Sequence, residues 1–169
     1  TGITPRQGRL DLRPLLHTDA LRATKPRHCS IDRNRPFDRG PLAERMVADI
    51  LPAIEKKSGG AFAYTLTNAD RSIGARLSGE IARRWGDQGM AQVPVRLKLD
   101  GVAGQSFGAW NVGGLELSLN GDANDYVGKG MAGGKIVLRP PHRSTFATEA
   151  TTIMGNTCLY GATGGRLFA

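Results

Sequence analysis

Residues 97–114 read LKLDGVAGQSFGAWNVGG, and the same pattern returns twenty residues later as LSLNGDANDYVGKGMAGG, residues 117–134. Seven of the eighteen aligned positions are identical, and four of those seven are glycine. Chance would give about one or two identities at this composition. A period near twenty, with short β-prone runs separated by glycine-rich turns, predicts a solenoid of stacked β coils.

A second repeat extends the pattern toward the C-terminus. Residues 130–135 align with residues 161–166 at a shift of thirty-one, and the eleven extra residues match an insertion at 140–150. Successive coils are expected to hydrogen-bond to one another about 4.8 Å apart, with aliphatic side chains stacked inside and glycine at the tight corners. The residues predicted to stack inside are Val93, Val95, Leu97 and Leu99, then Leu115, Leu117 and Leu119, then Ile136 with Leu138 or Val137.

The composition excludes several classes of protein. Of the 169 residues, 23 are glycine, which is roughly twice ordinary usage. The hydrophobic fraction of 40% is too high for a disordered chain, and no apolar run is long enough for a transmembrane helix. Two cysteines cannot build a disulfide scaffold.

The chain is predicted to divide into three parts. Residues 1–40 carry nine of the Lys and Arg residues but only four Asp, and are expected to form an extended basic arm lying on an acidic neighbouring surface. Nucleic-acid binding is disfavoured there, because the first 36 residues contain no aromatic side chain for base stacking. Residues 41–60 are predicted to form an amphipathic helix, and residues 61–169 the β coils, cut before the last of them.

Two motifs that suggest a ligand are better explained by turn geometry. Residues 128–133 satisfy G-x-G-x-x-G, but a dinucleotide fingerprint must open a helix, and the residues that follow have the pattern of a strand. Residues 120–125 resemble the start of a calcium loop, yet the required glycine and distal glutamate are missing. We therefore expect both segments to be corners of the repeat.

The remaining candidate residues form no catalytic or metal-binding pattern. The histidines lack paired ligand spacing, the cysteines lie far apart, and Ser106 is outside a nucleophile motif. The sequence therefore predicts no catalytic, cofactor-binding or metal-binding residue in this chain. The isolated histidines and cysteines are His17, His28, His142, Cys29 and Cys158.

Several blocks together resemble the carboxy-terminal region of the glutamate synthase large (α) subunit. The most specific is GDANDYVGKGMAGG, residues 121–134. The others are residues 70–82, 101–110, 139–141 and 155–165, with LLHTD at residues 15–19. The resemblance covers the chain from about residue 10 to its end.

The resemblance implies a function for the parent protein. Glutamate synthase converts glutamine, 2-oxoglutarate and a reductant into two glutamates, in the ammonia assimilation of the cytoplasm. It implies an amidotransferase domain, FMN and a 3Fe-4S cluster upstream of this region, with FAD and 4Fe-4S clusters on the small subunit of the NADPH form. The family's carboxy-terminal domain is a right-handed β-helix with a structural role, so the expected fold is mainly β: a right-handed single-stranded β-helix preceded by the basic arm and one amphipathic helix.

Two functions remain open at this point. The first is a non-catalytic scaffold inside a multidomain enzyme, with the other domains of the large subunit and the small subunit as partners, and with neither nucleic acid nor membrane. The second is a free-standing glycine-repeat interaction subunit of a split glutamate synthase or a related oxidoreductase. The wording of residues 109–111 and 155–165 favours the NADPH-dependent form over the ferredoxin-dependent form.

Overall fold

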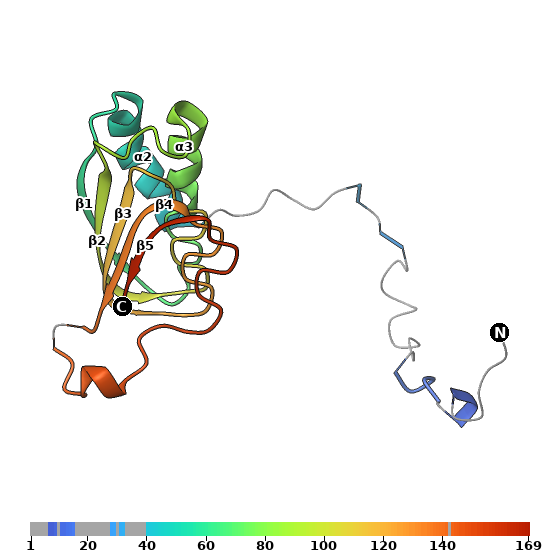
Figure 1. Cartoon of the computed structure of the whole chain (residues 1–169). Coiled ribbons are helices and arrows are strands. Elements are labelled where there is room, and N and C mark those ends of the chain that lie inside the picture. Colours follow the sequence, from blue (N-terminus) through green and yellow to red (C-terminus); the bar gives the residue numbers. More distant parts are fainter. Residues whose placement is uncertain (1–6, 10, 16–27, 30, 33–39, 142) are drawn as a thin grey trace. The chain divides into compact units, whose positions relative to one another are not determined.

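The computed structural model describes residues 7–9, 11–15, 28–29, 31–32, 40–141 and 143–169 (Figure 1). The chain divides into two units, Thr1–Phe37 and Asp38–Ala169. In the first unit, Gln7–Arg9 form a single 3-10 turn, η1, and Arg13 pairs with Asp11 at 2.8 Å. Most of the predicted basic arm lies outside the described residues.

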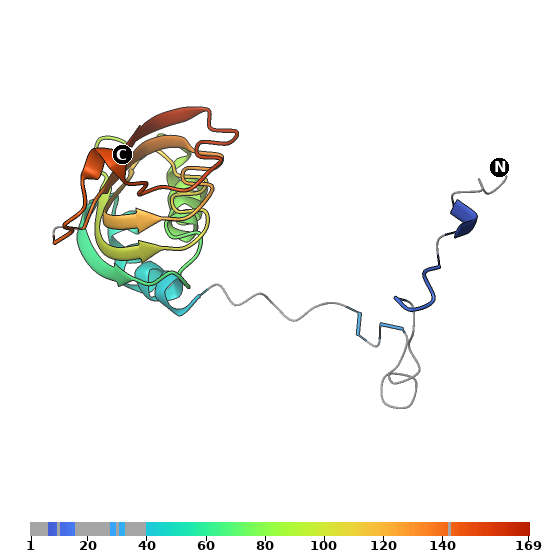
Figure 2. The same ribbon diagram turned by 90° about the horizontal axis from the view of Figure 1, so that it is seen from below.

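The second unit contains a five-stranded parallel sheet and two helices. The strands follow the order β1-β2-β3-β4-β5, so each strand pairs with the next one along the chain. Figure 2 shows this succession, with the loops that connect the strands stacked beside it. The bounds are α2 Pro41–Glu55, β1 Gly60–Leu66, α3 Ala75–Trp85, β2 Val95–Ala103, β3 Leu115–Ala123, β4 Ala132–Arg139, η2 Thr148–Ala150 and β5 Gly164–Phe168.

This arrangement corrects the predicted fold class. A mainly-β, right-handed β-helix was expected, whereas the structure is a parallel sheet with two helices, which is an α/β arrangement. The repeat describes how strands pair, but it carries no information on what else closes the core. Helical side chains do so here: Met46, Ile50, Ile54, Leu77 and Ile81 are buried in one cluster with the inward-facing residues of the strands.

The pairing between β2 and β3 follows the twenty-residue shift. Leu97 lies beside Leu117, Leu99 beside Leu119, and Gly101 beside Gly121. Glycine is required at this last pair, because a Cβ on Gly121, whose φ is +153°, would overlap the carbonyl oxygen of Gly101. Alternate residues of β3 point to the core, as expected for a strand with one buried face.

Two local expectations need adjustment. Val93 was expected to stack inside, but it precedes β2 and is 37% exposed. The predicted helix over 41–60 ends at Glu55, with Pro41 in its first turn and Pro52 inside it. Its buried face follows the predicted spacing, since every third or fourth residue must point the same way. None of the described helices is long and apolar enough to cross a membrane.

Helices α2 and α3 are held together by ion pairs around one buried carboxylate. Glu80 accepts hydrogen bonds from Arg76, Arg83 and Arg84 of its own helix. Two of these arginines also reach carboxylates of α2, Arg76 to Glu44 at 2.9 Å and Arg84 to Glu55 at 3.1 Å. The Trp85 indole adds a bond between the helices by donating to the carbonyl oxygen of Ile54 at 2.8 Å.

The network sets the protonation of Glu80. Burial opposes ionisation, but the hydrogen bonds from Arg84 and Arg83 outweigh it and hold the pKa of this carboxyl below its ordinary value. A carboxyl with a lowered folded-state pKa stabilises the fold above its unfolded-state pKa and loses that contribution as the pH falls.

Replacing Glu80 with Gln should therefore lower the free energy of unfolding by about 2 kcal/mol at pH 7, because three arginines lose a charged partner. The difference from wild type should shrink as the pH falls below the ordinary carboxyl pKa of 4.5, where the wild-type carboxyl is itself protonated. Urea denaturation of the 169-residue chain measures both. The exposed Glu149→Gln variant is the control, and a Glu80→Gln difference that persists unchanged at pH 3 would contradict the assignment.

Candidate functional site

Three glycine-rich loops stack beside the sheet and contain the motif residues. Each loop holds three alternate residues in the left-handed region, with φ between 53° and 67°. Non-glycine residues adopt this conformation at a cost of about 1–2 kcal/mol, so five of them at repeated positions require support from the surrounding structure. The residues are Ser106, Gly108 and Trp110 in the first loop, Tyr126, Gly128 and Gly130 in the second, and Thr157, Leu159 and Gly161 in the third.

The stack uses every backbone amide of the G-x-G-x-x-G segment. Two of these bonds, from Gly128 to the Phe107 carbonyl and from Gly130 to the Tyr160 carbonyl, join the middle loop to the loops on either side. The segment leads into β4 rather than into a helix. A phosphate cradle needs free amides at a helix N-terminus, so this loop is not organised to hold one. The six donors are Gly128 to Phe107, Lys129 to Tyr126, Gly130 to Tyr160, Met131 to Gly128, and Ala132 and Gly133 to Asn111.

Asn111 anchors the stack from inside. Its side chain is fully buried, and its amide nitrogen donates to the carbonyl oxygens of Leu115 and Gly133 at 3.0 Å each. Its amide oxygen has no hydrogen-bond partner. Gly134 lies against the same side chain, where a Cβ would overlap Asn111 and the carbonyl oxygens of Leu115 and Val112. This corner is therefore packed by backbone and by one amide, with no room for a larger side chain.

The candidate calcium segment is also occupied by contacts between loops. Asn120 donates to Asp100 at 3.0 Å, and Asn124 donates to Asn68 at 2.8 Å. Asp125 accepts from the Asn156 amide at 2.8 Å. Across the part of the chain that the structure describes, no three His, Cys, Asp or Glu residues come together as a metal-binding group.

The cysteines do not provide a site for an iron–sulfur cluster among the described residues. Cys158 is partly buried and donates to the Gly155 carbonyl at 3.3 Å, and burial raises the pKa of its thiol. A raised pKa disfavours the thiolate that ligates metal or attacks a substrate. Cys29 is exposed, in the other unit. His17 and His142 lie outside the described residues, and Ser106 is a left-handed stacking residue.

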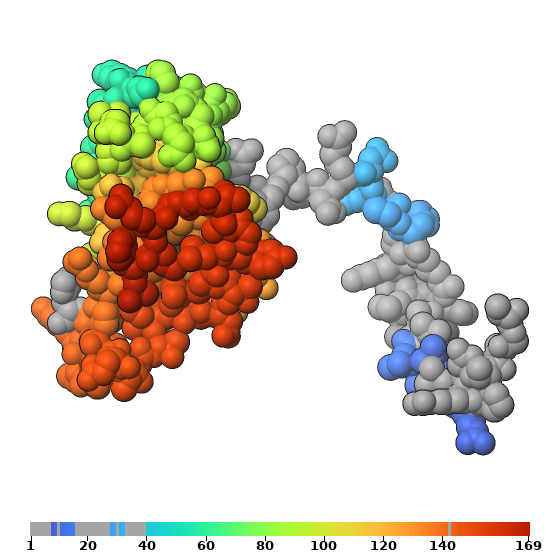
Figure 3. All heavy atoms as spheres, in the orientation of Figure 1, coloured from blue at the N-terminus to red at the C-terminus, as the bar shows by residue number. Residues whose placement is uncertain are grey.

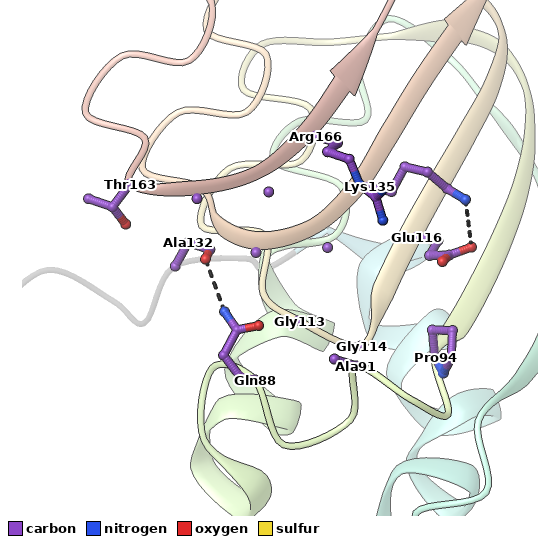
Figure 4. Close-up of a pocket in the computed structure, with 14 residues that line it drawn as sticks. Gln88, Ala91, Pro94, Gly113, Gly114, Glu116, Ala132, Lys135, Thr163 and Arg166 are labelled. Carbon is purple, nitrogen blue, oxygen red and sulfur yellow. Dashed lines mark hydrogen bonds and ion pairs between the residues drawn. The ribbon is translucent and has the colours of Figure 1, made fainter.

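An open groove of about 500 Å³ lies where β3, β4 and β5 begin (Figure 4). Three glycine pairs form much of it, at 113–114, 133–134 and 164–165. Gln88 holds one side by donating to the Ala132 carbonyl at 3.1 Å. The lining residues that the structure describes include no cysteine, histidine or serine. Their chemistry is that of a charged binding surface, with Glu116, Lys135 and Arg166 as its ionised side chains.

The sequence analysis missed this groove. It aligned Lys135 with Arg166 through the thirty-one-residue shift, and the structure pairs these residues in register. It interpreted the glycine pairs as corners, without recognising that three successive corners leave a surface without side chains. The basic residues at equivalent positions were the available signal.

Comparison with known proteins gives a consistent family. The protein-family model described as the GXGXG motif matches residues 43–169. The chain is 45% identical over 161 residues to the glutamate synthase [NADPH] large chain of Azospirillum brasilense, covering 95% of this chain and 10% of that protein. It is 52% identical over 121 residues to ferredoxin-dependent glutamate synthase 2 of Synechocystis sp., covering 72% and 8%. It is 48% identical over 127 residues to the glutamate synthase [NADH] of Schizosaccharomyces pombe, covering 75% and 6%. The chain thus spans a tenth or less of the length of these relatives.

Two glycines with the same φ of +75° test the packing of the loop stack. Gly86→Ala meets nothing within 4 Å and should cost only the left-handed strain of alanine, about 1 kcal/mol. Gly134→Ala adds an overlap with backbone oxygens and should cost about 3 kcal/mol or more. Urea denaturation of the 169-residue chain measures both, and equal losses would show that the stack tolerates a side chain at Gly134.

Proposed function

The chain belongs to the GXGXG motif family and corresponds to part of a glutamate synthase large chain, and on that basis we propose that it forms a non-catalytic structural domain of such an enzyme. The whole enzyme converts glutamine, 2-oxoglutarate and a reductant into two glutamates. Its place is in ammonia assimilation and glutamate biosynthesis, in the cytoplasm. The chemistry belongs to domains other than this one.

The observation that supports a structural role is the use of the glycine-rich loop. All six amides of residues 128–133 donate to carbonyl groups of the protein, so the segment that most resembles a cofactor loop is committed to holding neighbouring loops together. The core beneath it is aliphatic and continuous from the helices to β4. A rigid body of this kind can support neighbouring domains without taking part in their reactions.

The cofactors of the proposed enzyme belong elsewhere in it. FMN supplies hydride transfer, and the 3Fe-4S cluster passes single electrons to the flavin, with FAD and 4Fe-4S clusters on the small subunit of the NADPH form. The described residues do not fit these groups, because the loop amides are occupied and the thiol of Cys158 has a raised pKa. We assign no step of the reaction to residues of this chain.

The reductant and the partners are part of the same proposal. Relatives named for ferredoxin, NADH and NADPH all match at similar identities, between 44% and 52% among those covering more than two thirds of this chain, apart from a few slightly lower. Our preference for the NADPH form rests on the resemblance of residues 109–111 and 155–165. The proposed partners are the other domains of the large chain and, in the NADPH form, the small subunit.

The proposal predicts that the large chain tolerates loss of a side chain from the cofactor-like loop. Lys129 lies over the Tyr126 ring at 5.2 Å, and its amide remains in the stack when the side chain is removed. In the glutamate synthase that carries this segment, Lys129→Ala should keep its FMN content and its kcat for glutamate formation within about twofold of wild type.

Two results would contradict a structural role. One is a loss of FMN content or kcat of about tenfold or more in Lys129→Ala with an unchanged melting temperature. The other is saturable quenching of FMN fluorescence by the 169-residue chain alone. Gly134→Ala in the same enzyme should instead lower the melting temperature while the molecules that remain folded keep their turnover per bound FMN, with Gly86→Ala as its matched control.

A further inference from the structure

A row of charges crosses the outer face of the sheet. Arg96 of β2, Glu116 of β3, Lys135 of β4 and Arg166 of β5 occupy successive positions in register. The row contains three cations and a single carboxylate. Glu116 serves two of the cations, lying 3.2 Å from Arg96 and 3.2 Å from Lys135.

The far end of this row lacks a negative charge. Arg166 is exposed, and no ion pair joins it to any of the residues that the structure describes. Its neighbour in register is Lys135, and like charges on adjacent strands repel each other. A carboxylate placed between the two would replace that repulsion with two attractive pairs. Figure 3 shows the C-terminal residues, coloured red, on the surface of the unit, where a partner can reach them.

The groove beside this pair has the shape for an extended chain. It is open, and its glycine pairs present bare backbone (Figure 4). The glycines are required for the stacking itself, since a Cβ on Gly133 or Gly164 would meet backbone atoms of the neighbouring strand. Sites for small molecules enclose most of the ligand in an apolar cavity, whereas this groove is exposed and charged. Backbone without side chains allows another backbone to approach closely.

We infer that this groove docks an extended acidic segment of a partner protein domain, whose carboxylates pair with Lys135 and Arg166. Alternate residues of an extended segment lie about 6.6 Å apart on one face, within reach of two long basic side chains on neighbouring strands. Acidic residues at alternate positions are therefore the expected pattern. Nucleic acid is disfavoured, because Glu116 would repel phosphate and no aromatic side chain lines the groove for stacking. The inference deepens the proposed scaffold role and rests on it for the source of the partner.

The test uses the full 169-residue chain and a labelled peptide in which Glu alternates with Ser, with fluorescence anisotropy at low ionic strength. Two exposed ion pairs are worth about 0.5–1 kcal/mol each, so the double variant Lys135→Gln with Arg166→Gln should raise the Kd by about five- to tenfold or more. The matched control is Lys98→Gln with Arg139→Gln. It removes the same charge from the same face of the sheet, outside the groove, and should change the Kd by less than about twofold.

Each other outcome counts against the inference. Equal weakening by both double variants would show general attraction to a chain of net charge +8. Equal binding of a peptide with Gln in place of Glu, tighter binding of a single-stranded oligonucleotide, or full competition by millimolar phosphate would each identify a different occupant. Circular dichroism verifies that the variants fold. Because the assay needs no enzyme activity, its failure leaves the scaffold role standing, and the Lys129→Ala enzyme test can fail while peptide binding succeeds.

Discussion

Each glycine-rich loop of this protein depends on the carbonyl oxygens of the loops beside it. The amides of Gly128 and Gly130 point in opposite directions along the stack, one to Phe107 and the other to Tyr160. Such alternation requires left-handed backbone at every second residue, which explains why glycine recurs there. The buried amide of Asn111 extends the same pattern by serving two further carbonyl groups. No loop could satisfy its backbone alone, so sheet and loops form one cooperative structure.

The helices solve a different problem. A sheet of short strands buries little apolar surface by itself, and α2 and α3 supply the side chains that complete its core. Their mutual position depends on charge as well as packing, because Glu80 is surrounded by arginines that also reach Glu44 and Glu55. Breaking one member leaves charge without a partner, which is why such networks are costly to disturb.

These constraints determine which parts of the surface are free to act. The loop that most resembles a cofactor site is committed to internal hydrogen bonds, and the calcium-like segment is held by Asn68 and Asp100. What is left is the outer face of the sheet and the groove at the start of β3 to β5. There the stacking that requires glycine also removes side chains from the surface, while the register brings Lys135 beside Arg166. The internal constraint and the proposed docking surface thus have one cause.

The sequence by itself determined the family, through residues 121–134 and the other matching blocks, and the partners in the ladder, since Leu97 pairs with Leu117 and Leu99 with Leu119 as the shift aligns them. It also indicated the buried face of α2, because helical periodicity is local. Only the tertiary structure decided that two helices close the core and that three glycine corners form a groove. The physical reason is that a repeat records contacts between equivalent residues of neighbouring strands. Contacts between unlike elements, such as Trp85 with Ile54 or Gln88 with Ala132, leave no periodic trace in the sequence.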